Sequence, residues 1–135
     1  MAPRVARVLV IDDEPRIGRS LCLALGDEFE VVSTEDAAEA LKWLTAGDWF
    51  DVIFCDLMMP AMNGVELRAR VSECSPDLAA RIVFVTGGLL LPHVQALLES
   101  VPNTVLAKPF DLDAMRDLIR RRTARETGTS RASRS

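Results

Sequence analysis

The sequence predicts an α/β protein with a doubly wound parallel sheet, built from five strand–helix repeats, (βα)5. Short apolar runs alternate along the chain with segments whose apolar residues recur at helical spacing. The runs at 8–11, 52–55 and 81–85 are apolar at nearly every position, which is typical of parallel strands buried on both faces. Because crossovers between parallel strands are right-handed, few topologies remain, and the strand order 2-1-3-4-5 is the natural one.

The first repeat is a strand over residues 5–11 followed by a helix. Pro15 suits the first turn of that helix, Asp13 or Glu14 is available as its cap, and Gly26 ends it. The apolar face of this helix is expected to contain Ile17, Leu21 and Leu25.

The second repeat begins with the β-rich segment 30–34. A helix opens at Glu35 or Asp36 and ends at Gly47, because acidic residues cap helix starts and glycine follows helix ends. One face of this helix collects Ala37, Ala40, Leu41 and Leu44.

The third and fourth strands are predicted at 51–55 and 81–85. Residues 58–64 contain proline and an Asn-Gly pair and are predicted as a loop, after which a helix runs through Val71. Residues 86–88, Thr-Gly-Gly, form the turn after the fourth strand.

Pro92 opens the fourth helix, and a short fifth strand follows at 104–107. Asp111 caps the last helix, whose inward face is expected to contain Leu112, Met115, Leu118 and Ile119. We expect one domain over residues 4–122 and a disordered tail over 123–135, because the tail has no apolar residue beyond alanine.

The composition is that of one water-soluble domain. The 135 residues carry a net charge of −4, which gives no support for nucleic-acid binding. No segment is apolar enough to span a membrane, and the N-terminus lacks a signal-peptide core, so we expect a cytoplasmic protein. The odd number of cysteines, at Cys22, Cys55 and Cys74, favours reduced thiols, with Cys55 buried.

Four charged side chains follow predicted strands and should meet at one edge of the sheet. Asp12 and Asp13 end the first strand, Asp56 follows the third and Lys108 follows the fifth. In this fold ligands bind at the carboxyl ends of strands, beside the reversal of strand order. Three acids held together repel one another, and Mg²⁺, or Mn²⁺ in its place, is the dication that such oxygen ligands suit. The backbone carbonyl of Met58 would add a further oxygen ligand.

The same residues suit phosphoryl transfer to a carboxylate. Asp56, at the centre of the edge, is the best-placed nucleophile. Phosphoryl transfer depends mainly on positioning and on neutralising the phosphoryl oxygens. The metal would neutralise one oxygen and Lys108 another, while the Thr86 hydroxyl and the Gly87 N–H serve the third.

Four motifs together resemble the receiver domain of bacterial two-component response regulators, which has a flavodoxin-like fold. They lie in the family's order and spacing at 8–15, 56–64, 83–87 and 108–110. The resemblance implies that Asp56 accepts a phosphoryl group from a phosphohistidine on a histidine kinase or phosphotransfer protein. It also implies that Lys108 pairs with Asp56 and then with the phosphate, and that Thr86 moves toward the phosphate and rearranges the last helices.

Further expectations follow from this resemblance. The protein promotes its own phosphorylation and slow dephosphorylation but is not a turnover enzyme, and it forms a homodimer through the fourth and fifth helices. The family often has an aromatic residue three positions before the lysine, where this chain has Val105. We expect no output domain after residue 122, so a stand-alone receiver and the receiver of a hybrid kinase both remain open. The Thr-Gly-Gly turn at 86–88 and the lack of an output domain favour the hybrid type.

Simpler interpretations remain beside these. Taken alone, Asp12 and Asp13 would be helix caps. Thr86 alone would be a turn residue, and Lys108-Pro109 a simple turn whose peptide bond can be cis. His93 is interpreted as an exposed structural residue. The Arg120–Arg122 run is interpreted as a favourable charge at the helix C-terminus rather than as a docking patch, and Leu89–Leu91 as partly buried or as a docking patch.

Two other functions stay open. One is a phosphorylation-independent interaction module, favoured by Val105, and the other is a metal-dependent phosphotransferase or phosphohydrolase acting on small molecules.

Overall fold

The computed structural model describes residues 5–88 and 90–125, and in them five parallel strands form one sheet. The strand order is β2-β1-β3-β4-β5, which confirms the predicted topology. The strands are β1 (Arg7–Ile11), β2 (Glu30–Thr34), β3 (Val52–Asp56), β4 (Ile82–Thr86) and β5 (Val105–Ala107). The helices are α1 (Pro15–Leu25), α2 (Ala37–Thr45), α3 (Gly64–Cys74), α4 (Pro76–Ala80), α5 (Pro92–Glu99) and α6 (Leu112–Arg125).

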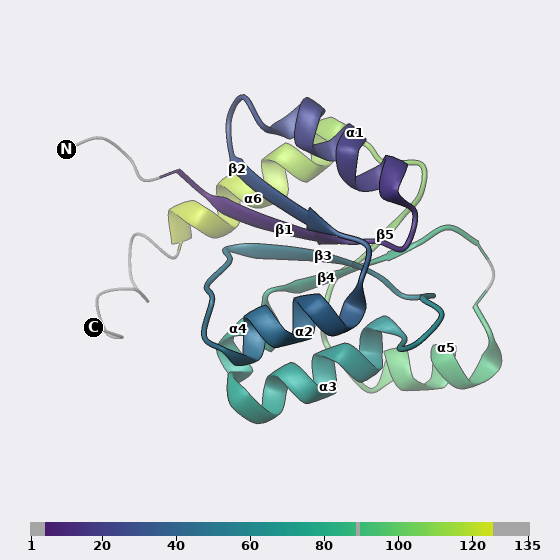
Figure 1. Cartoon of the computed structure of the whole chain (residues 1–135). Coiled ribbons are helices and arrows are strands. Elements are labelled where there is room, and N and C mark those ends of the chain that lie inside the picture. The colour runs from purple at the N-terminus through teal and green to yellow at the C-terminus, as the bar shows by residue number, and fades with distance from the viewer. Residues whose placement is uncertain (1–4, 89, 126–135) are drawn as a thin grey trace.

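Helices cover both faces of the sheet, as the continuous apolar strands predicted (Figure 1). Alternate strand residues point to opposite faces and build two cores. Leu9, Ile53 and Phe84 belong to the core beneath α2 and α3. Val10 and Phe54 belong to the other core, which α1 and α6 complete with Leu21, Leu25, Met115 and Ile119. The central strands are thereby fixed from both sides, and their carboxyl ends form a rigid edge.

Local signals explain most helix boundaries. The Asp36 side chain accepts the Ala38 N–H at the start of α2, and the Asp111 side chain accepts the Ala114 N–H in α6. Gly47 follows α2 with a φ of +99°, a conformation that suits glycine. Pro15 and Pro92 lie at the starts of α1 and α5 as predicted. Glu14 occupies the N-cap position of α1, one of the two predicted, but its side chain makes no capping hydrogen bond.

Several boundaries differ from the predicted ones. Strand β1 begins at Arg7 rather than at residue 5, and β3 and β4 each lie one residue later than predicted, so that Asp56 and Thr86 are strand residues. These two residues remain in the ladder because Asp56 pairs with Val85 and Thr86 with Ala107.

The helical layer also differs from the prediction. Helix α3 continues past Val71 to Cys74, and α4 follows it directly because the Ser75 side chain accepts the Leu78 N–H ahead of Pro76. Helix α6 extends to Arg125, beyond the predicted domain end at 122. The rest of the predicted tail, 126–135, and residues 1–4 lie outside the described residues.

The arginine run near the end of α6 has specific partners. Arg120 forms a two-pronged ion pair with Glu28 after α1, and Arg121 pairs with Asp117. Arg122 donates to the Arg81 carbonyl. The assignment of this run to the helix C-terminus alone was therefore incomplete, because Arg120 and Arg122 also tie α6 to its neighbours.

The remaining predictions on single residues can be placed. The three cysteines are free and Cys55 is buried. His93 is exposed, as expected, and the Lys108–Pro109 bond is cis. Leu91 is exposed and Leu90 packs partly against the core, while Leu89 lies outside the described residues. No helix within the described part of the chain has the length and apolar character needed to cross a membrane.

Candidate functional site

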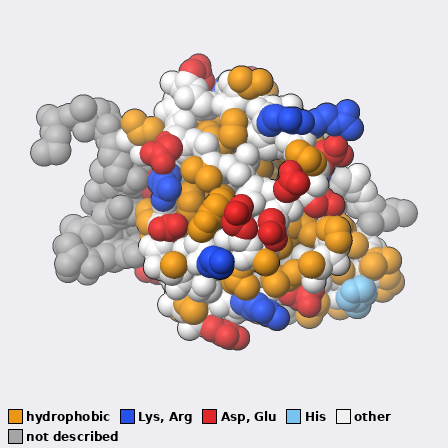
Figure 2. Space-filling model, in the orientation of Figure 1, with side chains coloured by type: hydrophobic (Ala, Val, Ile, Leu, Met, Phe, Trp, Pro, Cys, Tyr) orange, Lys and Arg blue, Asp and Glu red, His pale blue; other side chains and the backbone are white. Residues whose placement is uncertain are grey.

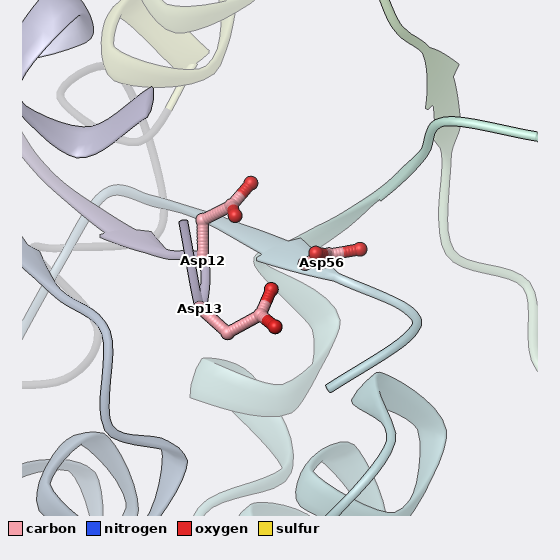
Figure 3. A group of neighbouring side chains, drawn as sticks. All are labelled: Asp12, Asp13 and Asp56. Carbon is pink, nitrogen blue, oxygen red and sulfur yellow. The ribbon is translucent and has the colours of Figure 1, made fainter. Parts of the chain in front are cut away.

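The predicted site residues meet at the carboxyl edge of the sheet. Asp12 and Asp13 leave the end of β1 and Asp56 ends β3, and their carboxylates lie beyond the strand ends around one shared space (Figure 3). A carboxylate oxygen from each lies within 4.8 Å of the others. Asp12 and Asp56 are buried and Asp13 is exposed, so the cluster opens to solvent on one side. Figure 2 shows acidic side chains gathered near the middle of the face that it presents.

Asp12 is held by two contacts, one at each carboxylate oxygen. Its Oδ1 accepts the backbone N–H of Glu14 at 2.9 Å. Its Oδ2 lies 2.9 Å from the Lys108 ammonium. Both contacts compensate for the burial of this carboxylate, which is almost fully removed from solvent.

Lys108 reaches the site from the end of β5. Its ammonium lies 2.9 Å from Asp12 Oδ2 and 3.7 Å from Asp56 Oδ2, so the expected pairing with Asp56 is the longer of two ion pairs. The side chain has to reach across from the edge strand, and the buried Asp12 provides the better hydrogen bond. Burial works against the charged form, but the hydrogen bond that Lys108 donates to Asp12 and the charge of Asp56 outweigh it and raise the pKa of Lys108.

Asp56 is a carboxylate in an unfavourable environment. Burial, together with the nearby charges of Asp12 and Asp13, raises its pKa to about 6, against the lowering effects of the Met58 N–H and Lys108. The Met58 N–H donates to Asp56 Oδ1 at 3.2 Å. A carboxyl group with a strongly shifted pKa at a strand end of this fold is a candidate functional group. Burial and the charge of Asp56 also raise the pKa of the neighbouring Cys55 thiol, which stays protonated.

Thr86 and Gly87 border the site at the end of β4. The Thr86 hydroxyl donates to the Gly88 carbonyl at 3.2 Å, which holds the turn. A Cβ on Gly87 would lie 3.3 Å from Lys108 Cδ, so this glycine lies directly against the lysine stem. The structure therefore places Gly87 against the lysine of the site, whereas the Thr86 hydroxyl is bound to the carbonyl of its own turn.

Two features of the site were not predicted. Gly64 was interpreted only as part of a turn, yet a Cβ there would lie 3.0 Å from the Asp56 carbonyl oxygen and 3.3 Å from Leu57 Cα. The Glu14 N–H that binds Asp12 was also missed, and the only sequence signal for it is an aspartate two residues before the residue that precedes α1. The other buried acid in the described residues, Asp51, lies before β3 at the opposite end of that strand and accepts the Arg7 N–H.

The donor set fits a hard dication. Three carboxylates supply oxygen ligands only, and their mutual repulsion is relieved by positive charge. Asp13 is exposed, so its carboxylate is accessible to an ion that retains several waters, and one carboxylate oxygen each of Asp12 and Asp56 lies within 4.8 Å of it.

A parallel 2-1-3-4-5 sheet with three acids and a lysine at its carboxyl edge defines a class of signalling domain. The sequence matches the response regulator receiver domain over residues 8–120, and the chain belongs to this family of two-component systems.

Individual relatives agree with the family assignment. The chain is 32% identical over 115 residues to the C4-dicarboxylate transport transcriptional regulatory protein DctD of Pseudomonas aeruginosa, covering 85% of this chain and 24% of that protein. It is 32% identical over 113 residues to the sensor histidine kinase RcsC of Salmonella typhi, covering 83% of this chain and 12% of that protein. The chain thus spans a quarter or less of the length of these two relatives.

The fold has solved counterparts. The receiver domain of the sensor histidine kinase PA1611 from Pseudomonas aeruginosa, with a magnesium ion coordinated in its active site cleft, superposes with a TM-score of 0.75. The two share 19% identity, and the match covers 90% of this chain and 99% of that one. At this identity the likeness supports the fold.

Proposed function

We propose that the domain is a phosphoacceptor in a two-component phosphorelay, with Asp56 as the residue that takes the phosphoryl group. The observation that carries the proposal is the position of Asp56 between an acidic pair and a lysine, at 3.7 Å from the Lys108 ammonium. The proposed donor is a phosphohistidine on a histidine kinase or phosphotransfer protein. Membership of the receiver family supports this class of partner.

Each residue at the carboxyl edge of the sheet would have a separate role in phosphoryl transfer. An Asp56 carboxylate oxygen attacks phosphorus, the new P–O bond forms as the N–P bond of the phosphohistidine breaks, and the imidazole leaves. Lys108 is close enough to neutralise a phosphoryl oxygen after a small movement. The Gly87 N–H and the Thr86 hydroxyl would bind another oxygen once the hydroxyl leaves the Gly88 carbonyl.

Asp12, Asp13 and Asp56, with the Met58 carbonyl, would hold Mg²⁺, and Mn²⁺ has the same preference for oxygen ligands. When bound, the dication supplies positive charge that neutralises phosphoryl oxygens during transfer. The magnesium ion in the PA1611 receiver supports this assignment by analogy.

The product is a stored signal rather than a released compound. We propose that the domain is not a turnover enzyme, since the phosphoryl group stays on Asp56 until water removes it. A homodimer through α5 and α6 is part of the same proposal, and exposed Leu97 on α5 gives it an apolar surface.

The test is phosphoryl uptake from a small donor. The protein is incubated with Mg²⁺ and acetyl phosphate, and its intact mass is measured. One phosphoryl group is expected on the wild type and on Asp48→Asn, which removes an exposed acid away from the site. None is expected on Asp56→Asn. Uptake that persists in Asp56→Asn, or no uptake in the wild type, contradicts the proposal.

A second function is favoured by Val105, a phosphorylation-independent interaction module. This valine is 38% exposed on β5, where the family often has an aromatic residue. Binding of a partner that is unchanged by Mg²⁺ with beryllofluoride, a phosphoryl mimic, would select this alternative.

A further inference from the structure

Three methionines and a histidine line one groove beside the acidic cluster. Met58, Met59 and Met62 lie in the loop between β3 and α3, and His93 lies near the start of α5. The groove has a volume of about 200 Å³. We propose that it binds a soft monovalent cation, Cu(I) or Ag(I), through the three thioethers and the imidazole. This inference is independent of the proposed phosphoacceptor role, because none of the three clustered aspartates lines the groove.

The chemistry of the donors selects the class of cation. Thioethers are soft, uncharged ligands that favour Cu(I), and imidazole also suits copper. Mg²⁺ and Ca²⁺ prefer oxygen ligands, and Zn²⁺ is bound by thiolates, imidazoles and carboxylates. The three cysteines lie outside the lining of this groove. A set of three thioethers and one imidazole therefore matches a soft monovalent cation better than a dication.

The other polar side chains of the groove are already engaged. Glu66 Oε1 accepts the Asn63 N–H at 3.0 Å, and Asn63 Oδ1 accepts the Glu66 N–H at 2.8 Å. This reciprocal pair caps α3 immediately after Met62. Glu66 is exposed at the groove, so its charge favours a cation there without making it a ligand.

The loop that carries the thioethers is fixed at both ends. At its start the Met58 N–H donates to Asp56 Oδ1 at 3.2 Å. At its end the Gly64 N–H donates to the Leu57 carbonyl at 3.0 Å. The backbone that presents the three methionines is thus held in place before a cation arrives, which lowers the entropic cost of binding.

The donor side chains combine access with freedom to adjust. Met58 is 37% exposed and His93 is exposed, and none of the hydrogen bonds or ion pairs of the described residues uses the His93 ring. Met59 and Met62 are partly buried against the core beneath α3. Because a methionine side chain has three rotatable bonds, its sulfur can turn toward an ion without a change of the backbone.

The experiment measures Cu(I) affinity in the full chain. Binding is followed without oxygen and in ascorbate, by competition with a coloured Cu(I) chelator. The background is Cys22→Ala/Cys74→Ser, because the thiols of these two residues are not fully buried and would bind Cu(I) themselves. One Cu(I) per chain is expected in this background.

Substitutions in the groove should weaken that binding. Met62→Leu and His93→Gln should each lower the affinity by about tenfold or more, since even partners outside the ligand shell are worth 10- to 100-fold. Met115→Leu, the same exchange in the core beneath α1 and α6, and Gln95→Ala, on the exposed surface of α5, should keep the affinity. Exchanges between methionine and leucine conserve volume and are well tolerated.

A second readout reports on the thioethers directly. On addition of Ag(I), which needs no reductant, the ¹³C resonances of the Met58, Met59 and Met62 methyl groups should shift, and that of buried Met115 should not. This measurement uses the unsubstituted loop, so it tests the site even if a variant fails to fold. Excess Mg²⁺ should leave the Cu(I) affinity unchanged, because a hard dication does not compete for thioethers.

Three results would overturn the inference. The first is loss of Cu(I) binding in the background without the two cysteines. The second is an equal affinity of Met62→Leu and Met115→Leu, or methyl resonances of the loop that do not respond to Ag(I). The third is displacement of Cu(I) by Mg²⁺, which would place the ion in the acidic cluster.

Discussion

Lys108 forms its shorter ion pair with Asp12, at 2.9 Å, and not with Asp56. The lysine thus neutralises the more buried member of the acidic cluster, while Asp56 retains a raised pKa. A carboxylate that remains poorly compensated is costly to the fold, and it is correspondingly ready to gain from a metal ion or a proton. The same carboxylate therefore lowers the stability of the metal-free fold and favours the binding of a cation, and each effect can be measured.

Replacing Asp56 by asparagine should stabilise the metal-free protein near neutral pH. The pKa of Asp56 is raised to about 6 from 3.8, so between these values the folded state holds a proton that the unfolded chain has lost. Stability therefore falls as the pH rises through this interval. With allowance for solvent screening, we expect Asp56→Asn to be more stable than the wild type by about 1–2 kcal/mol at pH 7.5.

Urea unfolding in EDTA at three pH values measures this effect. The difference should disappear at pH 4, where Asp56 is largely protonated in the folded state. Asp48→Asn, at an exposed position, should stay within about 0.5 kcal/mol of the wild type throughout. A wild type that equals Asp56→Asn at pH 7.5 would show that the Asp56 carboxylate is not destabilising.

Mg²⁺ should reverse this instability. A ligand that binds only the folded state adds about 2.7 kcal/mol to the free energy of unfolding at 100 times its Kd. We expect thermal unfolding to move upward with Mg²⁺ concentration in the wild type and in Asp48→Asn. Asp13→Asn and Asp56→Asn should lose most of the shift, because each removes a carboxylate from the cluster. An equal shift in all four proteins would place the ion elsewhere.

Gly64→Ala should damage the site through the backbone. The added Cβ would lie 3.0 Å from the Asp56 carbonyl oxygen, 3.2 Å from Phe84 Cδ1 and 3.3 Å from Leu57 Cα. Backbone atoms of a central strand cannot yield as a flexible side chain does, so we expect a loss of about 1–3 kcal/mol and slower phosphoryl uptake. Gly88→Ala, with open space around its Cβ, should change neither quantity. Equal behaviour of the two variants in urea unfolding and in uptake would contradict this role of Gly64.

The sequence was sufficient to predict the strand order and the residues at the carboxyl edge, because both depend on patterns that neighbouring residues reinforce. It was not sufficient to assign the partner of Lys108, which depends on how far one flexible side chain reaches from the end of β5 past β4 and β3 to the end of β1. The five-residue α4 was missed because Ser75 and Pro76 were not recognised as a new helix start so soon after α3. The tight approach of Gly64 was missed for a related reason, since a turn signal does not say what lies beneath the turn.

Asn103 ties the sheet to α3 far from the phosphoacceptor edge, and its loss should affect stability but not chemistry. Its amide donates to the carbonyls of Ala79 and Ile82 at 2.9 and 2.7 Å, and its Oδ1 accepts from Arg68 at 2.6 Å. Asn103→Ala leaves partly buried polar groups without these partners, and we expect a loss of about 1–3 kcal/mol in urea unfolding. Asn103→Asp keeps an acceptor for Arg68, but it sets a carboxylate oxygen against both carbonyls, so it should be no more stable than Asn103→Ala. Mg²⁺ affinity and acetyl phosphate uptake should stay at wild-type values in both variants below the onset of unfolding. Reduced uptake at full folding would instead mean that this end of β4 is coupled to Thr86 at the other.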